Sequence, residues 1–388
     1  MAISRRRFLQ AAGVTFIAVA GGTVYRSVDQ GVFEIGQGPA YETWHTWRSD
    51  ASTPQERIVK AGILASNPHN SQPWLFRIEE DRITLFADTT RQIGTIDPFL
   101  REMYIGLGCA VENMILAARA EGFQPDITLM PNEEDMTEVA RVDLNPGTVA
   151  ISNLYEAIPD RHTDRGPYDT DRSLPPTISD DIATLNDDED LRLFWFESID
   201  QREQFGDVAI RATEALINDD QQSIDGHVWW RHGWDTIQQQ QDGITLDAQS
   251  LDDFTLAAAK IIPDLSRSQA DQSFVNSVRT TQVPTAAAFG IIAVTDGMNA
   301  IQRLKCGQYW QRMHLWAVTQ GLSMHPLNQM CERADRELQL DITPEFGDAI
   351  RALLNDAIWD GIMPFRIGYP TRETRLSPRR TIDRVLIS

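Results

Sequence analysis

A loop rich in amides and prolines contains the first residues whose types and spacing could do chemistry. It runs from Ser66 to Trp74 and reads Ser-Asn-Pro-His-Asn-Ser-Gln-Pro-Trp. Prolines restrict the shape of such a loop, so the amide dipoles of Asn70 and Gln72 can point at a polar ligand. An ordinary loop is the alternative, but Asn-x-Gln-Pro-Trp is unusual enough to favour a binding role.

Two arginine segments could bind an anion. Arg161-His162-Thr163-Asp164-Arg165 places two guanidinium groups four positions apart with a hydroxyl between them. A guanidinium contacts phosphate oxygens in pairs, and a second cation can stabilise charge that develops on a polarisable ring carbonyl. The second segment is the pair Arg379-Arg380 near the C-terminus. Taken alone, this pair fits an anion site and a solvated tail equally well.

Together the three segments resemble the nitroreductase family, whose members are α+β flavoproteins built as intertwined dimers with FMN at the interface. The family's ring-edge segment is matched by Gly321-Leu322-Ser323-Met324-His325-Pro326-Leu327-Asn328-Gln329, and its Arg-x-Gly-Tyr-Pro motif by Arg366 to Pro370. The resemblance spans about Leu64 to Arg380 and implies FMN as the cofactor. The residues that it assigns to FMN are Asn70, Gln72, Arg161, His162, Thr163, Arg165, Pro326, Leu327, Asn328, Arg379 and Arg380.

The order of the motifs implies a fused pair of domains. In the family the arginine motif precedes the Asn-x-Gln-Pro-Trp loop, whereas here it follows that loop. A fusion explains the order if the first half contributes the loop and the second contributes the phosphate contacts. This is similar to the Acg-type subgroup of tandem nitroreductase-like proteins, in which a lid covers the flavin. We therefore expect an α+β fold of two nitroreductase-like domains, forming an intramolecular pseudo-dimer with one complete site, and a monomer in solution.

The elements that must position these residues repeat along the chain. Helices are predicted for 104–121, ended by Gly122, and for 306–320, ended by Gly321, and their Met, Leu and Ala residues coincide at one offset of 199 positions. The expected domains are 41–150 and 151–388. A stretch at about 219–265 contains Trp229, Trp230 and Trp234. It is predicted to be helical, either as a lid over a covered site or as a plain insertion.

The N-terminal thirty residues resemble a twin-arginine signal peptide. Ser4-Arg5-Arg6-Arg7-Phe8-Leu9 is followed by a short apolar run, and Ala18-Val19-Ala20 has the small residues of a cleavage site. The resemblance implies the twin-arginine translocon as a partner during export. It also implies a final location in the periplasm or at the outer face of the cytoplasmic membrane. A basic N-terminal helix is the alternative.

Composition excludes several other functions. A net charge of −21 and a pI near 4.7 argue against nucleic acid as a partner and against an anionic membrane surface. Three widely spaced cysteines exclude a disulfide framework and a four-cysteine metal site. His227 and His232 have a spacing that metal ligands can have, but the lid surface is the favoured reading, and no metal is expected. His314 and His325 are expected to pack in or near the second half's helix.

The resulting functional hypothesis is an exported FMN-binding oxidoreductase with a small-molecule redox substrate. It would pass electrons to nitroaromatic, quinone or similar acceptors. The alternative is a non-catalytic protein that binds or stores flavin under a lid that excludes NAD(P)H. Asn328-Gln329, which stands where the family has Glu-Gly, favours this alternative. A duplicated scaffold without flavin is the third and least favoured reading, because all three motifs are present.

Overall fold

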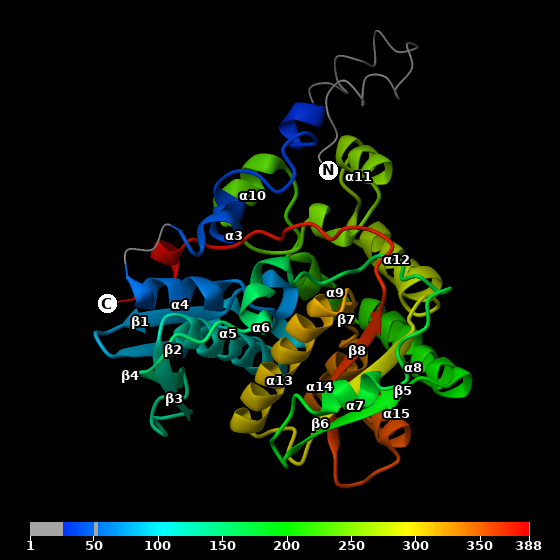
Figure 1. Cartoon of the computed structure of the whole chain (residues 1–388). Helices are drawn as coiled ribbons and strands as arrows, with labels where there is room; N and C mark the ends of the chain where they lie inside the picture. The colour runs from blue at the N-terminus through cyan, green and yellow to red at the C-terminus, as the bar shows by residue number, and fades with distance from the viewer. Residues whose placement is uncertain (1–25, 50–52, 388) are drawn as a thin grey trace.

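The computed structural model describes residues 26–49 and 53–387 (Figure 1). Most of the predicted signal segment, residues 1–25, lies outside the described residues. The described chain forms two four-stranded antiparallel sheets. In spatial order the first contains β1 (Trp74–Ile78), β2 (Arg82–Ala87), β4 (Glu138–Pro146) and β3 (Phe123–Leu129). The second contains β5 (Leu191–Phe196), β6 (Ala288–Val294), β8 (Asp360–Gly368) and β7 (Ser323–Pro326).

The two sheets repeat one topology. In the first half, α5 (Arg101–Ala120) connects β2 to β3, and in the second, α13 (Ala300–Thr319) connects β6 to β7. The second half adds α14 (Gln329–Leu340) and α15 (Glu345–Leu354) between β7 and β8, where the first half has a short connection. The expected α+β class, built from two related halves of one chain, is confirmed.

The halves meet where α5 crosses α13, near the centre of the molecule (Figure 1). A Cβ atom added to Gly307 would lie 1.9 Å from the carbonyl oxygen of Ile105. A Cβ atom on Gly108 would lie 2.0 Å from the carbonyl oxygen of Leu304. Gly307 lies 199 positions after Gly108, and Leu304 lies 199 positions after Ile105. The two contacts are therefore equivalent, with the roles of the helices exchanged. The crossing therefore has local two-fold symmetry, and its close approach depends on glycine in both helices.

Buried polar side chains continue the contact between the two helices. Gln311 donates a hydrogen bond to Asn113 at 2.9 Å, and Arg312 forms an ion pair with Glu112 at 2.9 Å. These polar groups are therefore paired across the crossing, as buried polar groups usually are.

Helices outside this crossing have local signals at their ends. α4 (Pro54–Ile63) begins after Thr53, whose side chain accepts a hydrogen bond from the Glu56 amide. α8 (Ile199–Asn218) begins with a capping box of Ser198 and Gln201. The connection between the sheets holds α6 (Asn153–Glu156) and α7 (Ile178–Ala183).

The C-terminal segment returns from the second half to the first. After β8 it crosses the molecule and pairs with β1, where the Phe76 amide donates to Val385 and the Ile387 amide donates to Phe76 (Figure 1). The chain thus ties its two halves together at the edge of the first sheet.

The predicted insertion at 219–265 holds α9 (Asp220–His227), α10 (Trp234–Gln240) and α11 (Asp253–Ile261), with α12 (Arg267–Ser277) following. Ile237 of α10 packs on Ala40 and Tyr41, which precede α3 (Glu42–Thr46). The N-terminal segment and the insertion therefore form one small cluster beyond the main core. Within residues 26–49 and 53–387, no helix has the length and apolar character needed to cross a bilayer.

Candidate functional site

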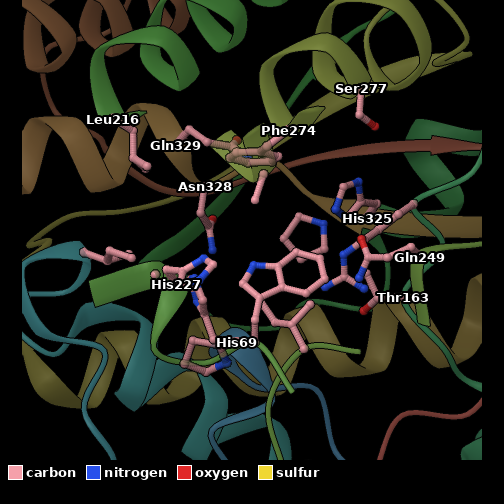
Figure 2. Close-up of a pocket in the computed structure, with 18 of the residues that line it drawn as sticks. His69, Thr163, Leu216, His227, Gln249, Phe274, Ser277, His325, Asn328 and Gln329 are labelled. Atoms are coloured by element: carbon pink, nitrogen blue, oxygen red, sulfur yellow. The ribbon is translucent and has the colours of Figure 1, made fainter. Parts of the chain in front are cut away.

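A cavity of about 490 Å³ lies between the two halves and the insertion. Its lining comes from the loop Ser66–His69, from α5, from Thr163 and Arg165, and from the insertion. In Figure 2, His69, His227 and Asn328 lie on one side, and Thr163, Gln249 and His325 lie on the other. The volume falls within the range of about 300–1,000 Å³ that is usual for ligand and cofactor sites.

Behind the Ser66 end of this cavity, two buried arginines have no carboxylate partner among the described residues. Arg161 is 3% exposed and Arg379 is 2% exposed. Arg161 donates to the Leu64 carbonyl at 3.3 Å, and Arg379 donates to the Ala65 carbonyl at 3.2 Å. In the part of the chain that the structure describes, neither Nε atom has a partner. A buried cation is expected to be paired with an anion. The unpartnered Nε atoms of Arg161 and Arg379 could therefore donate hydrogen bonds to a bound anion.

Burial lowers the pKa of both guanidinium groups. The pKa of Arg161 falls to about 10 because of desolvation. That of Arg379 falls well below its usual range through desolvation and the neighbouring charge of Arg161. Two further arginines, Arg165 in the cavity wall and the fully buried Arg366, lie around Asp164. The region thus holds four arginines, of which Arg165 and Arg366 interact with Asp164, in a chain whose net charge is −21.

Two histidines in this region are held as neutral rings. Arg366 donates to Nδ1 of His325 at 3.2 Å, and Arg161 lies 3.5 Å from Nδ1 of His314. Desolvation and the adjacent arginine lower the pKa of each ring well below its usual value. His314 uses its Nε2–H on the carbonyl of His162 at 3.2 Å. Because His325 lines the cavity and accepts at Nδ1, it can offer its Nε2–H to a ligand.

The Asn-x-Gln-Pro-Trp loop holds other backbone segments. Asn70 donates to the carbonyls of Gly243 and Pro378, at 3.1 and 2.9 Å. Gln72 donates to the Gln241 carbonyl at 2.8 Å and accepts from the Arg380 amide at 2.8 Å. These amides therefore fasten the insertion and the C-terminal segment over the cavity, and it is Ser66 to His69 that line it.

The structure separates residues that are adjacent in the sequence. Arg379 faces Ala65 and stacks over Trp44, whereas Arg380 donates to the carbonyls of Gln72 and Arg384. The two arginines therefore have different partners, because neighbouring side chains of an extended segment point to opposite sides, and a joint phosphate contact stays a prediction. Likewise Pro326 and Asn328 line the cavity, while Leu327 packs in the core of the second half. His162 packs against Trp44.

His227 and His232 lie on the face of the insertion that is turned to the cavity. Both line the cavity, together with His69. Burial lowers the pKa of His69 to about 4, with the charge of Arg165 as a further cause. Across the described residues, no group of three His, Cys, Asp or Glu side chains has the geometry for a metal ion.

Sequence reasoning missed the acidic wall opposite the arginines. Glu102 of α5 and Glu332 of α14 line the cavity beside Asn328 and Gln329. The side-chain oxygens of Asn328 and Gln329 are buried without a partner in the described structure. Glu102 and Glu332 are 230 positions apart. No local pattern could have connected them, because charged residues at helical spacing usually mark a solvated face.

A buried aspartate closes the insertion over the cavity. Asp242, 3% exposed, pairs with Arg91 of the first half and with Arg231 of the insertion, the latter at 2.7 Å. Arg165 adds a bond to the Ala248 carbonyl at 3.2 Å. The insertion is thus held closed by a central ion pair and by backbone contacts.

We expect Asp242→Asn to speed exchange of a cavity ligand by about 30-fold, because removing the buried carboxylate that pairs with both Arg91 and Arg231 costs about 2 kcal/mol. Ligand release measured by stopped-flow fluorescence checks the effect. Asp253→Asn, at an exposed partner of Arg375, is the matched control and should leave the rate unchanged. An unaltered release rate in Asp242→Asn would show that the backbone contacts alone hold the insertion.

The chain is similar in sequence to proteins of Mycobacterium tuberculosis. No family model matches it. An uncharacterised protein of Mycobacterium tuberculosis is 25% identical over 342 residues, covering 85% of this chain and 92% of that protein. A second protein of the same organism, provisionally named as an NAD(P)H nitroreductase, is 30% identical over 152 residues. That alignment covers 39% of this chain and 42% of the relative, so it spans less than half of either protein.

Solved structures with low similarity include two flavoproteins. An FMN-dependent nitroreductase of Mycobacterium smegmatis in complex with NADPH has 15% identity and a TM-score of 0.37, covering 60% of this chain and 96% of that one. An iodotyrosine deiodinase bound to FMN and 3-iodo-L-tyrosine has 12% identity and a TM-score of 0.36, covering 59% and 95%. Similarity at this level concerns the fold and does not define a shared function.

Proposed function

We propose that this protein is a nitroreductase-like oxidoreductase of the tandem, Acg-like kind that binds FMN. It passes electrons to small-molecule acceptors such as nitroaromatics or quinones. The observation that carries this proposal is the excess of buried arginine around one end of a ligand-sized cavity. Nitroreductase-like relatives and the three sequence motifs support it.

The residues present fit a phosphate ester with an attached ring system. The orphaned Nε atoms of Arg161 and Arg379 are the donors that a phosphate would satisfy. Thr163, Arg165 and His325 line the adjoining cavity and would face the ring. FMN, when bound, supplies the hydride and electron chemistry. The chain's own residues bind the phosphate, orient the ring and exclude water through the closed insertion.

Arg165 would set the charge next to the ring. Its guanidinium lies in the cavity wall with its backbone amide held by Ser250 at 3.2 Å. A fixed cation favours the more negatively charged, reduced form of a bound flavin. We expect Arg165→Ala to lower the reduction potential of bound FMN, which redox titration against a dye measures. A potential equal to the wild-type value would exclude this role.

The first experiment is spectroscopic. The chain lacking Met1 to Ala20 is purified, its visible spectrum is recorded, and NADPH is added without oxygen. A yellow protein whose oxidised flavin band bleaches supports the oxidoreductase, and acceptor turnover can then be screened. A colourless protein that takes up no added FMN rejects the proposal.

The closed insertion favours a second candidate, a protein that holds flavin without turning over. Asp242, Asn70 and Gln72 all fasten the insertion above the cavity. If the yellow protein bleaches with dithionite but not with NADPH, this second function is the better one. Bleaching with NADPH at a useful rate excludes it.

We also propose export by the twin-arginine route, with the mature protein in the periplasm or at the outer face of the cytoplasmic membrane. The motif around Arg5-Arg6 supports this, and fractionation of cells with and without a working translocon tests it. We propose a monomer in solution, because the two halves already pair within one chain.

A further inference from the structure

We propose that Glu102 and Glu332 share one proton and donate it to the acceptor as that acceptor is reduced in the cavity. The inference rests on the proposed function, since it concerns the reaction in the same cavity. The acceptor class is one whose reduced oxygen takes up a proton, such as a nitro compound or a quinone.

The geometry brings two carboxyl groups together in the cavity wall. Glu102 is 5% exposed and Glu332 is 6% exposed, and both line the cavity. Their carboxyl groups are close neighbours in this wall, and Asn328 contacts Glu102. Two carboxylates cannot hydrogen-bond to one another without a proton between them. The buried contact therefore requires one shared proton, as in other carboxyl dyads.

The surrounding charges do not remove this requirement. Arg101 donates to Glu102 at 3.3 Å, but its Nε is bonded to Asp335 at 2.7 Å. Asp97 also lies nearby and accepts from the amides of Glu102 and Met103, at 3.1 and 2.9 Å. Arg303 is bonded to backbone carbonyls, and Cys331 is a buried thiol. Four carboxyl groups thus lie near one guanidinium, which is ion-paired with Glu102 and Asp335.

Burial raises the pKa of Glu102 to about 7, with Asp97 adding to the rise and Arg101 opposing it. The pKa of Glu332 is raised well above its usual value by burial and by Glu102. The pair therefore holds a proton at neutral pH and loses it as the pH rises. This direction matches a proton donor, whose active form is the protonated one.

The proposed step is the transfer of one proton from the carboxyl pair to the acceptor. The O–H bond of the carboxyl pair breaks, and a new O–H bond forms on the acceptor, which receives its two electrons from an NAD(P)H-class donor through the proposed cofactor. The pair changes from a net charge of −1 to −2 and regains a proton from water. Asn328 and Gln329, with unpartnered oxygens at the same wall, can orient a protonated product.

The first test needs neither flavin nor turnover. Infrared difference spectra of the flavin-free protein are recorded from pH 5 to 9, with ¹³C-labelled glutamate. We expect a protonated-carboxyl band at pH 6 that weakens as the pH rises. Both Glu332→Gln and Glu102→Gln should remove it. Absence of the band in the wild-type protein at pH 6 would overturn the shared proton.

The second test measures acceptor reduction by the flavin-loaded protein as a function of pH. In the wild type the rate should fall as the pH rises and the pair loses its proton. Glu332→Gln should reduce the rate about 100-fold and abolish that pH dependence. The control is Glu337→Gln on the same helix, which lies away from the cavity and should keep both rate and pH profile.

The outcomes separate this inference from the proposed function. If Glu332→Gln is yellow and reduces acceptors with the pH profile of the wild type, the proposed proton donor is wrong and the proposed function stands. A protein that binds no flavin overturns the function and the donor role together, and its lack of colour identifies that case.

Discussion

Gly307→Ala is expected to destabilise the protein by about 3 kcal/mol or more, the largest effect on stability of any change considered. The added methyl would stand 1.9 Å from the Ile105 carbonyl oxygen, and the contacted atom is backbone. No side-chain rotation can relieve that contact, so α5 and α13 must move apart. Overpacking of a core usually costs about 1–3 kcal/mol, and a rigid backbone obstacle lies at or above that range.

A matched control separates packing from helix propensity. Gly347 lies within α15, and a Cβ atom there would meet Pro344 at an ordinary 3.5 Å. Gly347→Ala should therefore be neutral or stabilise by up to about 1 kcal/mol, because Ala is the better helix former. Urea unfolding of the three proteins measures both values. Equal stability of Gly307→Ala and the wild type would contradict the close crossing.

Arg161→Met is expected to weaken FMN binding by about 30- to 100-fold, because it removes charge-assisted contacts worth about 2–3 kcal/mol. The same change should leave the flavin-free protein as stable as before, or more stable by about 1–3 kcal/mol. Arg161 is buried with long hydrogen bonds of 3.3 and 3.5 Å and without a carboxylate in the described structure. Replacing such a group by an apolar one of similar volume is often stabilising.

The two effects have opposite signs, which a merely structural role would not produce. Fluorescence titration with FMN gives the affinity, and thermal unfolding of the flavin-free protein gives the stability. Arg380→Met is the contrasting variant, because Arg380 is bonded to the Gln72 and Arg384 carbonyls at 3.2 and 2.6 Å. The Arg380→Met variant should be less stable than the wild type and should keep most of its affinity for FMN. Weaker binding in Arg380→Met than in Arg161→Met would reverse the assignment.

The repeated helices could be predicted from the sequence because their signals are local. Apolar spacing and the glycine stops at Gly122 and Gly321 depend on residues within a few turns. The predicted span 104–121 compares with α5 at Arg101–Ala120, and 306–320 with α13 at Ala300–Thr319. The observed helices begin a few residues before the predicted ones, because Asp97 and Asn299 accept hydrogen bonds from the amides of the first turns. The apolar spacing used for the prediction does not include these bonds.

The site could be predicted in part. Thr163 and Arg165 were found through one short segment, and both line the cavity. Asn70 and Gln72 were found as well, but their amides bind backbone carbonyls of segments far along the chain. A sequence shows which side chains can donate a hydrogen bond. It does not show which acceptor the fold brings within reach.

The amino-acid sequence by itself determined the helices, the amide-rich loop, the arginine segments and the duplicated order, because these depend on neighbours along the chain. Only the tertiary structure decided which charges meet. It separated Arg379 from Arg380, placed Arg379 beside Arg161 and joined Glu102 to Glu332. The physical reason is that burial and charge pairing act between residues that are close in space, and the crossing of α5 and α13 sets those distances.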